Sequence, residues 1–476
     1  MANALVWLRR DLRLHDNPAL AQAMADGFVP VLVYVHAPQE QGGWVPGAAS
    51  RTWLHHSLCA LQRDIARLGG RLIIARGQSL SELERMQAAT QAEALYFSNL
   101  YEPILQARDA QVQNEFVKRG LPVKRFNANL LFEPWQIQTG GGTPYKVFTP
   151  FWRNASAQLR VLPAFPAPER LPDCGLEGLS VDALGLLPKN DWHAGFWHDW
   201  QPGEAGAAEM LEIFCDSAID GYKEQRNLPD RTGTSKLSPH LHFGEISPQQ
   251  IWRRIADVKL PESGQADIGH FKSELGWREF SYHLLHHFPR SSDHNLNSQF
   301  EHFSWATPDP DLLDRWQRGR TGIPIVDAGM RELWQTGWMH NRVRMIVASF
   351  LCKNLRMHWL HGARWFWDTL LDADLANNSQ GWQWTAGCGA DAAPFFRIFN
   401  PVLQGEKFDP EGDYIRTWCP ELAKLPARFI HKPFEAPEMI LRGAGVTLGG
   451  TYPKPVIGLA EGRARALAAF AGLRGG

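Results

Sequence analysis

Residues 371–384 read Leu-Asp-Ala-Asp-Leu-Ala-Asn-Asn-Ser-Gln-Gly-Trp-Gln-Trp, and they combine two carboxylates, two adjacent asparagines and two indoles. The short side chains of Asp, Asn and Ser hydrogen-bond the nearby backbone, so they favour a loop or a helix end over a helix interior. Such a segment can hydrogen-bond a polar heterocycle and place aromatic surface beside it. The alternative is a polar turn followed by two core tryptophans, Trp382 and Trp384.

A second polar stretch lies earlier, where residues 231–239 read Arg-Thr-Gly-Thr-Ser-Lys-Leu-Ser-Pro. Ser238 followed by Pro239 predicts a helix start, with Ser as the N-cap residue and Pro at the first helical position. The free N–H groups and the dipole of a helix start favour an anion such as phosphate. A capped surface helix is the more common use of Ser-Pro, so this stretch alone does not assign a site.

Residues 271–278 read Phe-Lys-Ser-Glu-Leu-Gly-Trp-Arg. In a helix, Phe271, Glu274 and Arg278 share one face. Trp277 lies at the edge of that face. Glu274 and Arg278 are either a surface ion pair, which contributes little to stability, or part of the lining of a cleft with an aromatic floor.

Residues 338–345 repeat this arrangement with Trp-Met-His-Asn-Arg-Val-Arg-Met. Asn341, Arg344 and Met345 are three and four positions apart, so a helix points them the same way. A buried Asn needs partners for its amide, so Asn341 indicates a polar network or a bound polar ligand. Met345 on such a face is more often core than a contact to a cofactor.

The first 131 residues alternate two kinds of pattern. Short apolar runs at 4–8, 30–35, 71–76 and 94–97 predict buried strands, and the clearest helical pattern runs from Ser50 to Leu68. Strands that alternate with helices predict a parallel sheet with crossover helices. Because no Gly-x-Gly-x-x-Gly or P-loop motif follows the first strand, the sequence does not support a dinucleotide or NTP site there.

Residues 132–204 lose this periodicity. They hold three consecutive glycines at 140–142 and a proline-rich run at 163–172, which predicts a long interdomain linker. Beyond it helical patterns recur with frequent stop signals, and Ser247-Pro248 marks another helix start. The sequence therefore predicts an α/β domain at 1–131, a linker at 132–204 and a larger all-α domain at 205–476.

The composition limits the function classes. With 44% hydrophobic and 21% charged residues among 476, the chain has the composition of a soluble globular protein. The net charge of −1 gives no sign of nucleic acid binding, so such a site must be a local patch. Apolar runs are too short for a bilayer span and charges occupy the N-terminus, so we expect a cytoplasmic protein. The six cysteines lack paired spacing and predict neither a zinc site nor disulfides.

The quoted segments, taken together with several others, resemble the DNA photolyase/cryptochrome family. The resemblance rests on residues 8–18 (LRRDLRLHDNP), 145–151 (YKVFTPF), 234–239 (TSKLSP), 277–280 (WREF), 337–342 (GWMHNR), 381–384 (GWQW), 396–401 (FRIFNP) and 405–409 (GEKFD). These motifs follow one another in the family's order over nearly the whole chain. The resemblance implies a Rossmann-like α/β domain beside an antenna pigment, then a linker, then a helical domain that binds FAD in a U shape and carries catalysis.

The resemblance also implies which residues hold FAD. They are Tyr222, Thr234, Ser235, Lys236, Leu237 and Ser238 near the phosphates and ribitol, Phe271, Glu274, Arg278 and Asn341 on the adenine and substrate side, and Arg344, Asp372, Asp374 and Asn378 around the isoalloxazine. Asn378 is expected to face N5. Lys236 and Phe271 stand where the family commonly has Arg and Trp. The Asp372–Arg344 pair is expected to be buried, where loss of one partner is costly.

Within the family, residues 381–384 and the segment 392–397 look like class I cyclobutane pyrimidine dimer photolyase. The implied activity is that of a deoxyribodipyrimidine photolyase, a carbon–carbon lyase in which excited reduced FAD passes an electron to the dimer. The implied catalytic residues are Glu274, Asn341, Met345 and Asn378. The implied DNA contacts are Arg226, Trp277, Arg342, Trp384, Arg397 and Lys407, with the two indoles stacking against an extruded dimer. The partner is damaged DNA, and we expect a monomer.

Three tryptophans, Trp382, Trp359 and Trp305, look like the chain that re-reduces oxidised flavin under light. Trp316 is an alternative for the third position. In the segment Tyr101–Asp109, Ile104 and Leu105 replace the polar pair of folate-binding members. A methenyltetrahydrofolate antenna is therefore disfavoured, which leaves a deazaflavin, a flavin or no second pigment as alternatives.

Three other functions compete with dimer repair. A cryptochrome photoreceptor uses the same cofactor without repair, but plant members carry Asp at the position of Asn378. Repair of the (6-4) photoproduct goes with two histidines where this chain has Asn341 and Met345. A generic two-domain nucleotide-binding protein is the third, and a colourless purified protein would favour it.

Overall fold

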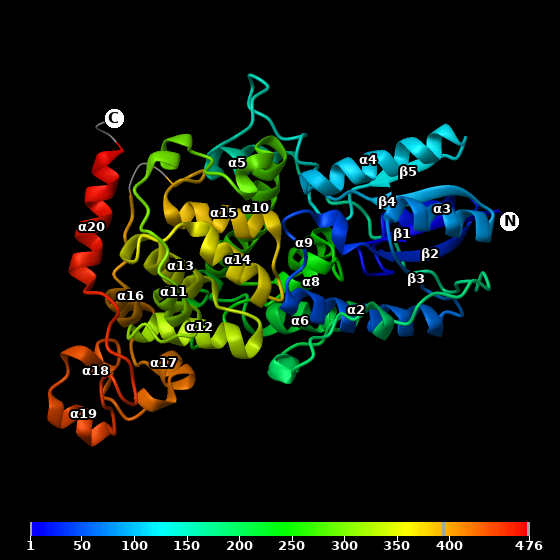
Figure 1. Ribbon diagram of the computed structural model, residues 1–476. Helices are drawn as coiled ribbons and strands as arrows, with labels where there is room; N and C mark the ends of the chain where they lie inside the picture. The colour runs from blue at the N-terminus through cyan, green and yellow to red at the C-terminus, as the bar shows by residue number, and fades with distance from the viewer. Residues whose placement is uncertain (1, 393–395, 474–476) are drawn as a thin grey trace.

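A computed structural model describes residues 2–392 and 396–473 of the chain (Figure 1). Its first part is a parallel sheet with strand order β3–β2–β1–β4–β5. The strands are β1 (Asn3–Leu8), β2 (Val29–His36), β3 (Ile73–Arg76), β4 (Ala92–Ser98) and β5 (Val123–Phe126). The predicted α/β domain and its first four strands are confirmed. We did not predict β5, because this short edge strand is only partly buried and carries Lys124 and Arg125 between its apolar ends.

The sheet buries both of its faces. Along β1, Val6 and Leu8 pack toward one face while Leu5 and Trp7 pack toward the other, as the two-residue period of a strand requires. Helices α1 (Pro18–Ala25) and α2 (Ala48–Arg67) cover the first face, and α3 (Ser79–Thr90) and α4 (Pro103–Lys118) cover the second. The first face also packs against Phe243, Trp338 and Leu371 of the helical half, so the two halves share one apolar core.

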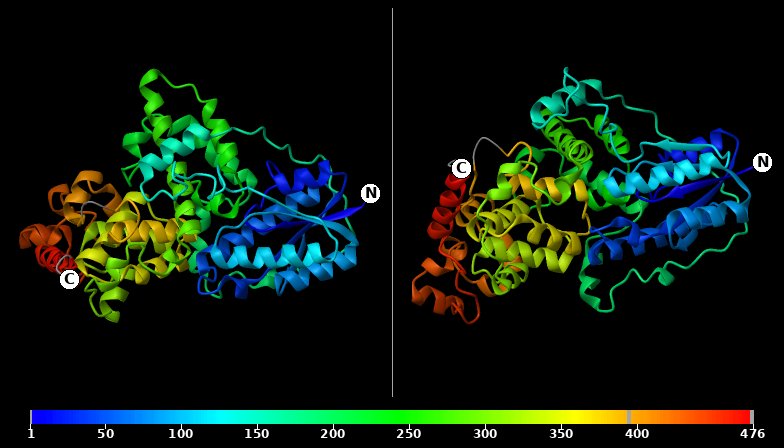
Figure 2. Two further views of the ribbon diagram at one scale, coloured as in Figure 1. Left: turned by 90° about the horizontal axis from the view of Figure 1, so that it is seen from above. Right: turned by 45° about the horizontal axis from the view of Figure 1, so that its top comes forward.

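The segment between the two halves holds more structure than its composition predicts. Helix α5 (Phe148–Gln158) buries Phe148, Phe151 and Ala155 against α10 (Gln265–His287). The chain then returns along the outside of the α/β domain, where the Leu171 and Leu179 amides donate to carbonyl oxygens of Leu68 and Ile74 at 2.9 and 2.8 Å. Figure 2 shows this return before α6 begins. The boundaries at 131 and 204 stay predictions.

The second half is helical, as predicted. Its helices are α6 (Glu204–Ser217), α7 (Tyr222–Gln225), α8 (Ser238–Phe243), α9 (Pro248–Ala256), α10 (Gln265–His287), α11 (Pro310–Gln317), α12 (Pro324–Thr336), α13 (Asn341–Ser349), α14 (Trp359–Thr369), α15 (Leu375–Ala386), α16 (Pro401–Phe408), α17 (Asp413–Trp418), α18 (Ala427–Ile430), α19 (Glu438–Ala444) and α20 (Leu459–Gly472). A π-helical turn at Phe350–Asn354 follows α13. Helices α10, α13, α14 and α15 lie together, while α18, α19 and α20 lie on the side away from the sheet (Figure 1).

The two predicted Ser-Pro helix starts have different outcomes. Ser247 caps α9, because its side chain accepts from the Gln250 amide at 2.9 Å while the Gln250 side chain accepts from the Ser247 amide at 2.7 Å. A helix does begin at Ser238-Pro239, as predicted, but the N-cap assignment is wrong: Leu237 is the N-cap residue of α8, Ser238 is its first helical residue, and no side chain caps the helix. The Ser238 hydroxyl is thereby left free for another partner.

The prediction of a loop or helix end for residues 371–384 is correct only up to Asp374. Asp374 caps α15 by accepting from the Asn377 amide at 2.9 Å, and the residues after it are helical. The helix tolerates its asparagines because both side chains bond outside the helical ladder. The Asn377 side chain donates back to Asp374 at 2.7 Å and the Asn378 side chain donates to the Ala363 carbonyl at 2.9 Å.

No helix in the described part of the chain is both long enough and apolar enough to cross a membrane. No group of His, Cys, Asp and Glu side chains within residues 2–392 and 396–473 could hold a metal ion. All six cysteines are free thiols.

Asp327 of α12 joins the helical core to the C-terminal segment. Its fully buried carboxylate accepts from the Thr321 amide and hydroxyl at 2.6 Å each, from the Gly322 amide at 2.9 Å and from the Tyr452 hydroxyl at 2.7 Å. We expect Asp327→Ala to lower the free energy of unfolding by about 3 kcal/mol, because it leaves several buried donors without an acceptor. Urea denaturation followed by circular dichroism measures this change.

Asp314→Ala is the matched control, because Asp314 makes an exposed pair with Arg318 in the same region. We expect that control to change the free energy of unfolding by less than about 0.5 kcal/mol. Equal denaturation midpoints for Asp327→Ala and Asp314→Ala would contradict the assigned role of Asp327.

Candidate functional site

A cavity of about 570 Å³ lies between α8, α10, α13 and α15. It brings together most of the residues that the sequence singled out, although they span more than 150 positions from α7 to α15. Those that line it are Tyr222, Arg226, Ser235, Leu237, Ser238, Phe271, Glu274, Trp277, Arg278, Asn341, Arg342, Arg344, Met345, Asp372, Asp374, Asn378, Trp382 and Trp384. The predicted shared faces of residues 271–278 and 341–345 therefore both open onto one cavity.

The remaining predicted residues lie elsewhere. Thr234 precedes the lining residue Ser235 without lining the cavity itself, and the Lys236 ammonium lies 5.7 Å from the ring centroids of Trp200 and Trp338, in a different cavity. Arg397 is exposed and places its guanidinium 5.7 Å from the Trp384 ring centroid, and Lys407 is exposed beside Phe408. Of the motif at 392–397, residues 393–395 lie outside the described part of the chain.

One end of the cavity carries a bidentate ion pair. The Arg344 guanidinium donates to the two carboxylate oxygens of Asp372 at 3.1 and 2.9 Å, and its Nε donates to the Met339 carbonyl at 2.7 Å. The Asp372 side chain is 3% exposed, whereas that of Arg344 is 24% exposed. The pair expected from the sequence is thus present, with its carboxylate buried and its guanidinium facing the cavity.

Asp374 is the most heavily bonded group at this end. Besides the α15 N-terminus, its carboxylate accepts from the Tyr282 hydroxyl, and it lies 3.5 Å from the His242 ring. Burial opposes ionisation of Asp374, yet hydrogen bonding to His242 and the charges of Arg278 and Arg10 hold its pKa below the usual range. Asp374 therefore supplies a fixed negative charge beside the cavity.

Glu274 does not pair with Arg278, the partner that helical spacing offers, but with Arg226. Its carboxylate pairs with Arg226 at 2.8 Å, while Arg278 donates to the Asn129 carbonyl at 2.7 Å. Glu274 and Arg278 both line the cavity, which favours the cleft over the surface ion pair. Burial raises the pKa of Glu274, and the charges of Arg226 and Arg342 lower it in part. Burial therefore favours the neutral form of this carboxyl group more than water does.

Two half-buried indoles line the cavity from different helices. The Trp277 ring stacks on Phe148 of α5 with centroids 3.8 Å apart and planes 10° apart, which fixes its orientation. Trp384 projects from α15 beside Arg397. Arg342, which also lines the cavity, donates to the Asn227 side chain, and its guanidinium lies 4.5 Å from the Phe408 ring centroid. Aromatic surface and cations thus occur together along the rim.

Trp382 is almost fully buried at the back of the cavity. It packs so closely on Gly362 of α14 that a methyl group there would lie 2.0 Å from the Trp382 ring. Its ring centroid is 6.1 Å from that of Trp316 and 5.0 Å from that of Phe366.

The other two predicted tryptophans, Trp359 and Trp305, are linked by a histidine. The Trp359 indole donates to the Asn295 side chain at 2.9 Å, and His358 contacts the rings of both Trp359 and Trp305.

Sequence reasoning missed several lining residues. They are His242, Ser281, Asn377, Gln380 and Thr385, with Tyr282 bonded to Asp374 just behind them. The helical period of α10 could have identified Ser281 and Tyr282. Both lie about one turn beyond Arg278 and two turns beyond Glu274, on the same face of the helix. His242 had no such sequence signal, because its role depends on the packing of α8 against α15.

Two family models match the chain. Residues 271–472 match the FAD binding domain of DNA photolyase, and residues 4–169 match the DNA photolyase family. The deoxyribodipyrimidine photo-lyase of Agrobacterium fabrum is 46% identical, over 99% of this chain and 98% of that protein. Cryptochrome-1 of Arabidopsis thaliana is 39% identical, over 97% of this chain and 69% of that protein. A crystal structure of a bacterial class III photolyase from Agrobacterium tumefaciens covers 100% of this chain and 98% of that chain, with a TM-score of 0.96 and 45% identity.

The residues present fit an FAD molecule. The Ser235 and Ser238 hydroxyls line one end of the cavity and find no acceptor for their protons within the described ranges, so both are free to donate to phosphate oxygens. The other end offers the Arg344 guanidinium and the unpaired Asn378 carbonyl oxygen, which suit the polar edge of a flavin ring. Apolar surface from Leu241, Leu275 and Phe366 lies between these ends. The predicted fold and FAD cofactor are therefore confirmed at the level of the domain.

Because Arg226 is the nearest cation to Glu274, we expect Arg226→Met to raise the pKa of Glu274 further. The protonated fraction of Glu274 at a given pH then increases. Carbon-13 NMR of labelled glutamate carboxyl groups, followed over a pH titration of the wild type and the variant, measures the change. Arg254→Met is the control. It removes the ion-pair partner of Glu212 and is expected to leave the pKa of Glu274 unchanged. A Glu274 titration that is the same in Arg226→Met and the wild type would show that the ion pair is absent in solution.

Proposed function

The chain belongs to the DNA photolyase/cryptochrome family, and we propose that it is a deoxyribodipyrimidine photolyase that repairs cyclobutane pyrimidine dimers in DNA under light. The observation that carries this proposal is the single cavity in which the FAD-binding residues and the two indoles Trp277 and Trp384 lie together. The identity of 46% to the Agrobacterium fabrum enzyme over nearly the full length supports the same activity.

Reduced FAD, when bound and excited by light, is the donor that would pass an electron to the dimer. The chain's own residues position that donor. Ser235 and Ser238 bind the phosphates, and the Arg344–Asp372 pair holds one edge of the flavin ring. The Asn378 side chain is fixed by its bond to the Ala363 carbonyl at 2.9 Å, and its carbonyl oxygen would then be the group available to accept from a reduced flavin ring.

The dimer reaches the cavity by leaving the duplex, which costs little because a damaged pair is already poorly stacked. Trp277 and Trp384 stack against it, and base–aromatic stacking is worth about 1–3 kcal/mol per base. Glu274 and Asn341 hydrogen-bond the pyrimidine edges, and Met345 packs against the dimer. Burial raises the pKa of Glu274 and so favours the protonated form, which is the form that could donate to a pyrimidine carbonyl that gains negative charge.

Arg226, Arg342, Arg397 and Lys407 contact the phosphates on either side of the lesion in this proposal. Arg226 and Arg342 line the cavity, and Arg397 lies beside Trp384. Lys407 and Arg342 both lie near the Phe408 ring. The cations gather there although the chain as a whole has a net charge of −1. Such contacts position the DNA and make affinity fall with salt, whereas the indoles and Glu274 select the lesion.

The three tryptophans form a route for electrons from the surface to the cavity in this proposal. Trp382 borders the cavity, Trp359 is buried, and Trp305 is only partly buried and contacts Trp359 through His358. Trp316 is fully buried and donates to the Val347 carbonyl at 3.2 Å, so it has no access to solvent reductants. Trp305 is therefore the better third member, and Trp316 is a side contact of Trp382.

The finer predictions stay proposals. The motifs look like class I enzymes while a class III structure is 45% identical, so we propose dimer repair without a subclass. Ile104 is 50% exposed at the start of α4, and an antenna pigment other than folate, or none, remains our expectation. A cytoplasmic location and a monomeric state are likewise predictions.

Repair of single lesions tests the proposal directly. Purified protein loaded with reduced FAD is illuminated with blue light together with oligonucleotides that carry either one cyclobutane dimer or one (6-4) photoproduct, and products are separated by chromatography. We expect restored pyrimidines from the cyclobutane dimer alone. A protein that holds reduced FAD but restores neither lesion is a photoreceptor, and one that restores the (6-4) lesion overturns the assignment of Asn341 and Met345.

We expect Trp382→Phe to slow light-driven reduction of oxidised FAD at least tenfold, because phenylalanine is much harder to oxidise than tryptophan. Absorbance near 450 nm follows this reaction. Trp359→Phe and Trp305→Phe are expected to act in the same direction, and Trp316→Phe to have a smaller effect. Trp135→Phe, at a residue 41% exposed and away from the cavity, is the control. Photoreduction of Trp382→Phe at the wild-type rate would exclude Trp382 from the route.

A further inference from the structure

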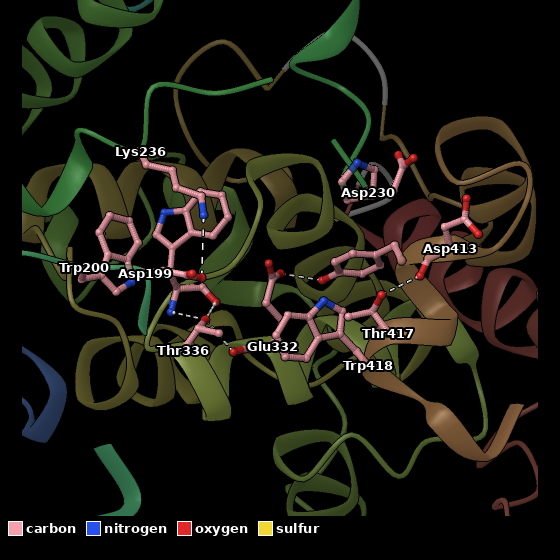
Figure 3. A pocket seen from close by; sticks show the side chains of 12 residues that line it. Asp199, Trp200, Asp230, Lys236, Glu332, Thr336, Asp413, Thr417 and Trp418 are labelled. Carbon is pink, nitrogen blue, oxygen red and sulfur yellow. Dashed lines mark hydrogen bonds and ion pairs between the residues drawn. The ribbon is translucent and has the colours of Figure 1, made fainter. Parts of the chain in front are cut away.

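A second cavity, of about 220 Å³, lies beside the FAD site. It is bounded by the end of the linker at 199–200, the loop at 229–236, the segment from α12 to Trp338, and α17. Figure 3 shows side chains from these parts facing one another across it. Its size suits a molecule of one or two rings. Of the residues assigned to FAD, dimer or DNA binding, only Lys236 lines it.

Four aromatic side chains take part in the wall of this cavity, among polar and charged ones. Trp200 and Trp338 form one side, and Tyr414 and Trp418 form the other. Trp200 and Trp338 are 5% and 9% exposed, so their orientation is fixed by packing. Flat, rigid aromatic surfaces on two sides favour a planar ligand or a cation that can lie against a ring face.

The charged groups around the cavity leave an excess of carboxylate. Lys236 lies 3.9 Å from Asp199, and Arg231 lies 3.1 Å from Asp230, so each of these acids has a cation nearby. Glu332 and Asp413 have no ion-pair partner anywhere in residues 2–392 and 396–473. An anionic ligand is therefore disfavoured, and a cationic ligand would balance the two unpaired acids.

Glu332 is the group most clearly prepared for a ligand. One of its carboxylate oxygens accepts from both the His340 amide at 3.2 Å and the Tyr414 hydroxyl at 2.5 Å. The other oxygen has no hydrogen-bond donor within the described residues, although the side chain is only 6% exposed. Burial raises the pKa of Glu332, and the hydrogen bonds to Tyr414 and His340 and the charges of Arg344 and Lys236 offset this only in part, so the pKa is about 7. A cation bound beside this carboxyl group favours its ionised form. In Figure 3 this carboxyl group extends from α12 into the space between Lys236 and Trp418.

The same wall already holds one cation. The Lys236 ammonium lies 5.7 Å from the ring centroids of both Trp200 and Trp338. Lys236 has a φ of +50°, a conformation that L residues other than Asn and Asp seldom adopt, and it turns this side chain away from the flavin cavity that Ser235 and Leu237 line. The aromatic and acidic surface therefore binds an ammonium group within this molecule, while the half of the cavity next to Glu332 has none.

From these contacts we propose that the cavity is a binding site for a small planar organic cation of the amidinium or guanidinium class. Its N–H groups donate to the free oxygen of Glu332 and to Asp413, and its flat face lies against Tyr414 or Trp418. Planar cations of this kind are weakly hydrated, stack on aromatic rings and match carboxylates with two parallel N–H donors, which a compact ammonium does not. The site is separate from the proposed repair reaction and does not depend on it.

Matched probes test the charge requirement in solution. Fluorine-19 NMR of 4-fluorobenzamidinium and of 4-fluorobenzoate, each titrated into the FAD-loaded full chain, compares a planar cation with an anion of nearly the same shape. We expect binding of the cation and at least about tenfold weaker binding of the anion. Equal binding of the two probes, or binding of the anion alone, would overturn the proposal.

Two variants test the location. We expect Glu332→Gln to weaken binding of the cation at least about tenfold, because it removes the carboxylate charge. Thr417→Trp places a large side chain in the cavity from α17, without altering a carboxylate, and is expected to abolish binding while the FAD content stays at the wild-type level. Unchanged binding by either folded variant would refute the site.

A crystal of the wild-type protein soaked with 4-bromobenzamidine gives an answer that does not depend on the folding of any variant. We expect the anomalous signal of bromine in the cavity between Glu332 and Trp418. Bromine found only in the FAD and dimer cavity, only at the protein surface or nowhere would contradict the proposal. None of these outcomes depends on whether the protein repairs DNA, so the two proposals fail separately.

Discussion

The buried carboxylate of Asp374 is the interaction on which the site depends. It caps α15, accepts from the Tyr282 hydroxyl of α10 and lies 3.5 Å from His242 of α8, so one charged group joins three of the four helices around the cavity. The positive charges of Arg278 and Arg10 keep its pKa low despite burial. Since α15 also carries Asn378, Trp382 and Trp384, the position of each of these residues follows from where Asp374 starts the helix.

The cavity needs polar groups at both ends and aromatic surface at its rim, and the chain supplies them from distant segments. The Arg344–Asp372 pair and the free hydroxyls of Ser235 and Ser238 are polar ends that a dinucleotide such as FAD can span. The rim combines Trp277, held by its stack on Phe148, with Arg226, which pairs with Glu274, and Arg342, which donates to Asn227. A chain with no overall positive charge can in this way present a local surface for DNA.

Much of this arrangement could be predicted from the sequence because helical spacing fixes which side chains share a face. Glu274 with Arg278, and Asn341 with Arg344 and Met345, line the cavity as their spacing requires. The pairing of Glu274 with Arg226 could not be predicted, because it depends on how α7 packs against α10. The helical state of residues 375–384 was also missed, since local propensity favours a turn there and the partners that offset it, Tyr282 and Ala363, lie far away in the sequence. Lys236 shows the same limit, because its unusual φ turns it out of the FAD site that its neighbours line.

The central claim is that this one cavity holds reduced FAD close enough to an extruded dimer for an electron to pass between them. The fluorescence lifetime of bound reduced FAD, measured with saturating oligonucleotide, tests that proximity before any product forms. We expect an oligonucleotide with one cyclobutane dimer to shorten the lifetime severalfold and the same sequence without damage to leave it unchanged. Equal lifetimes with the two oligonucleotides, both bound, would contradict the account.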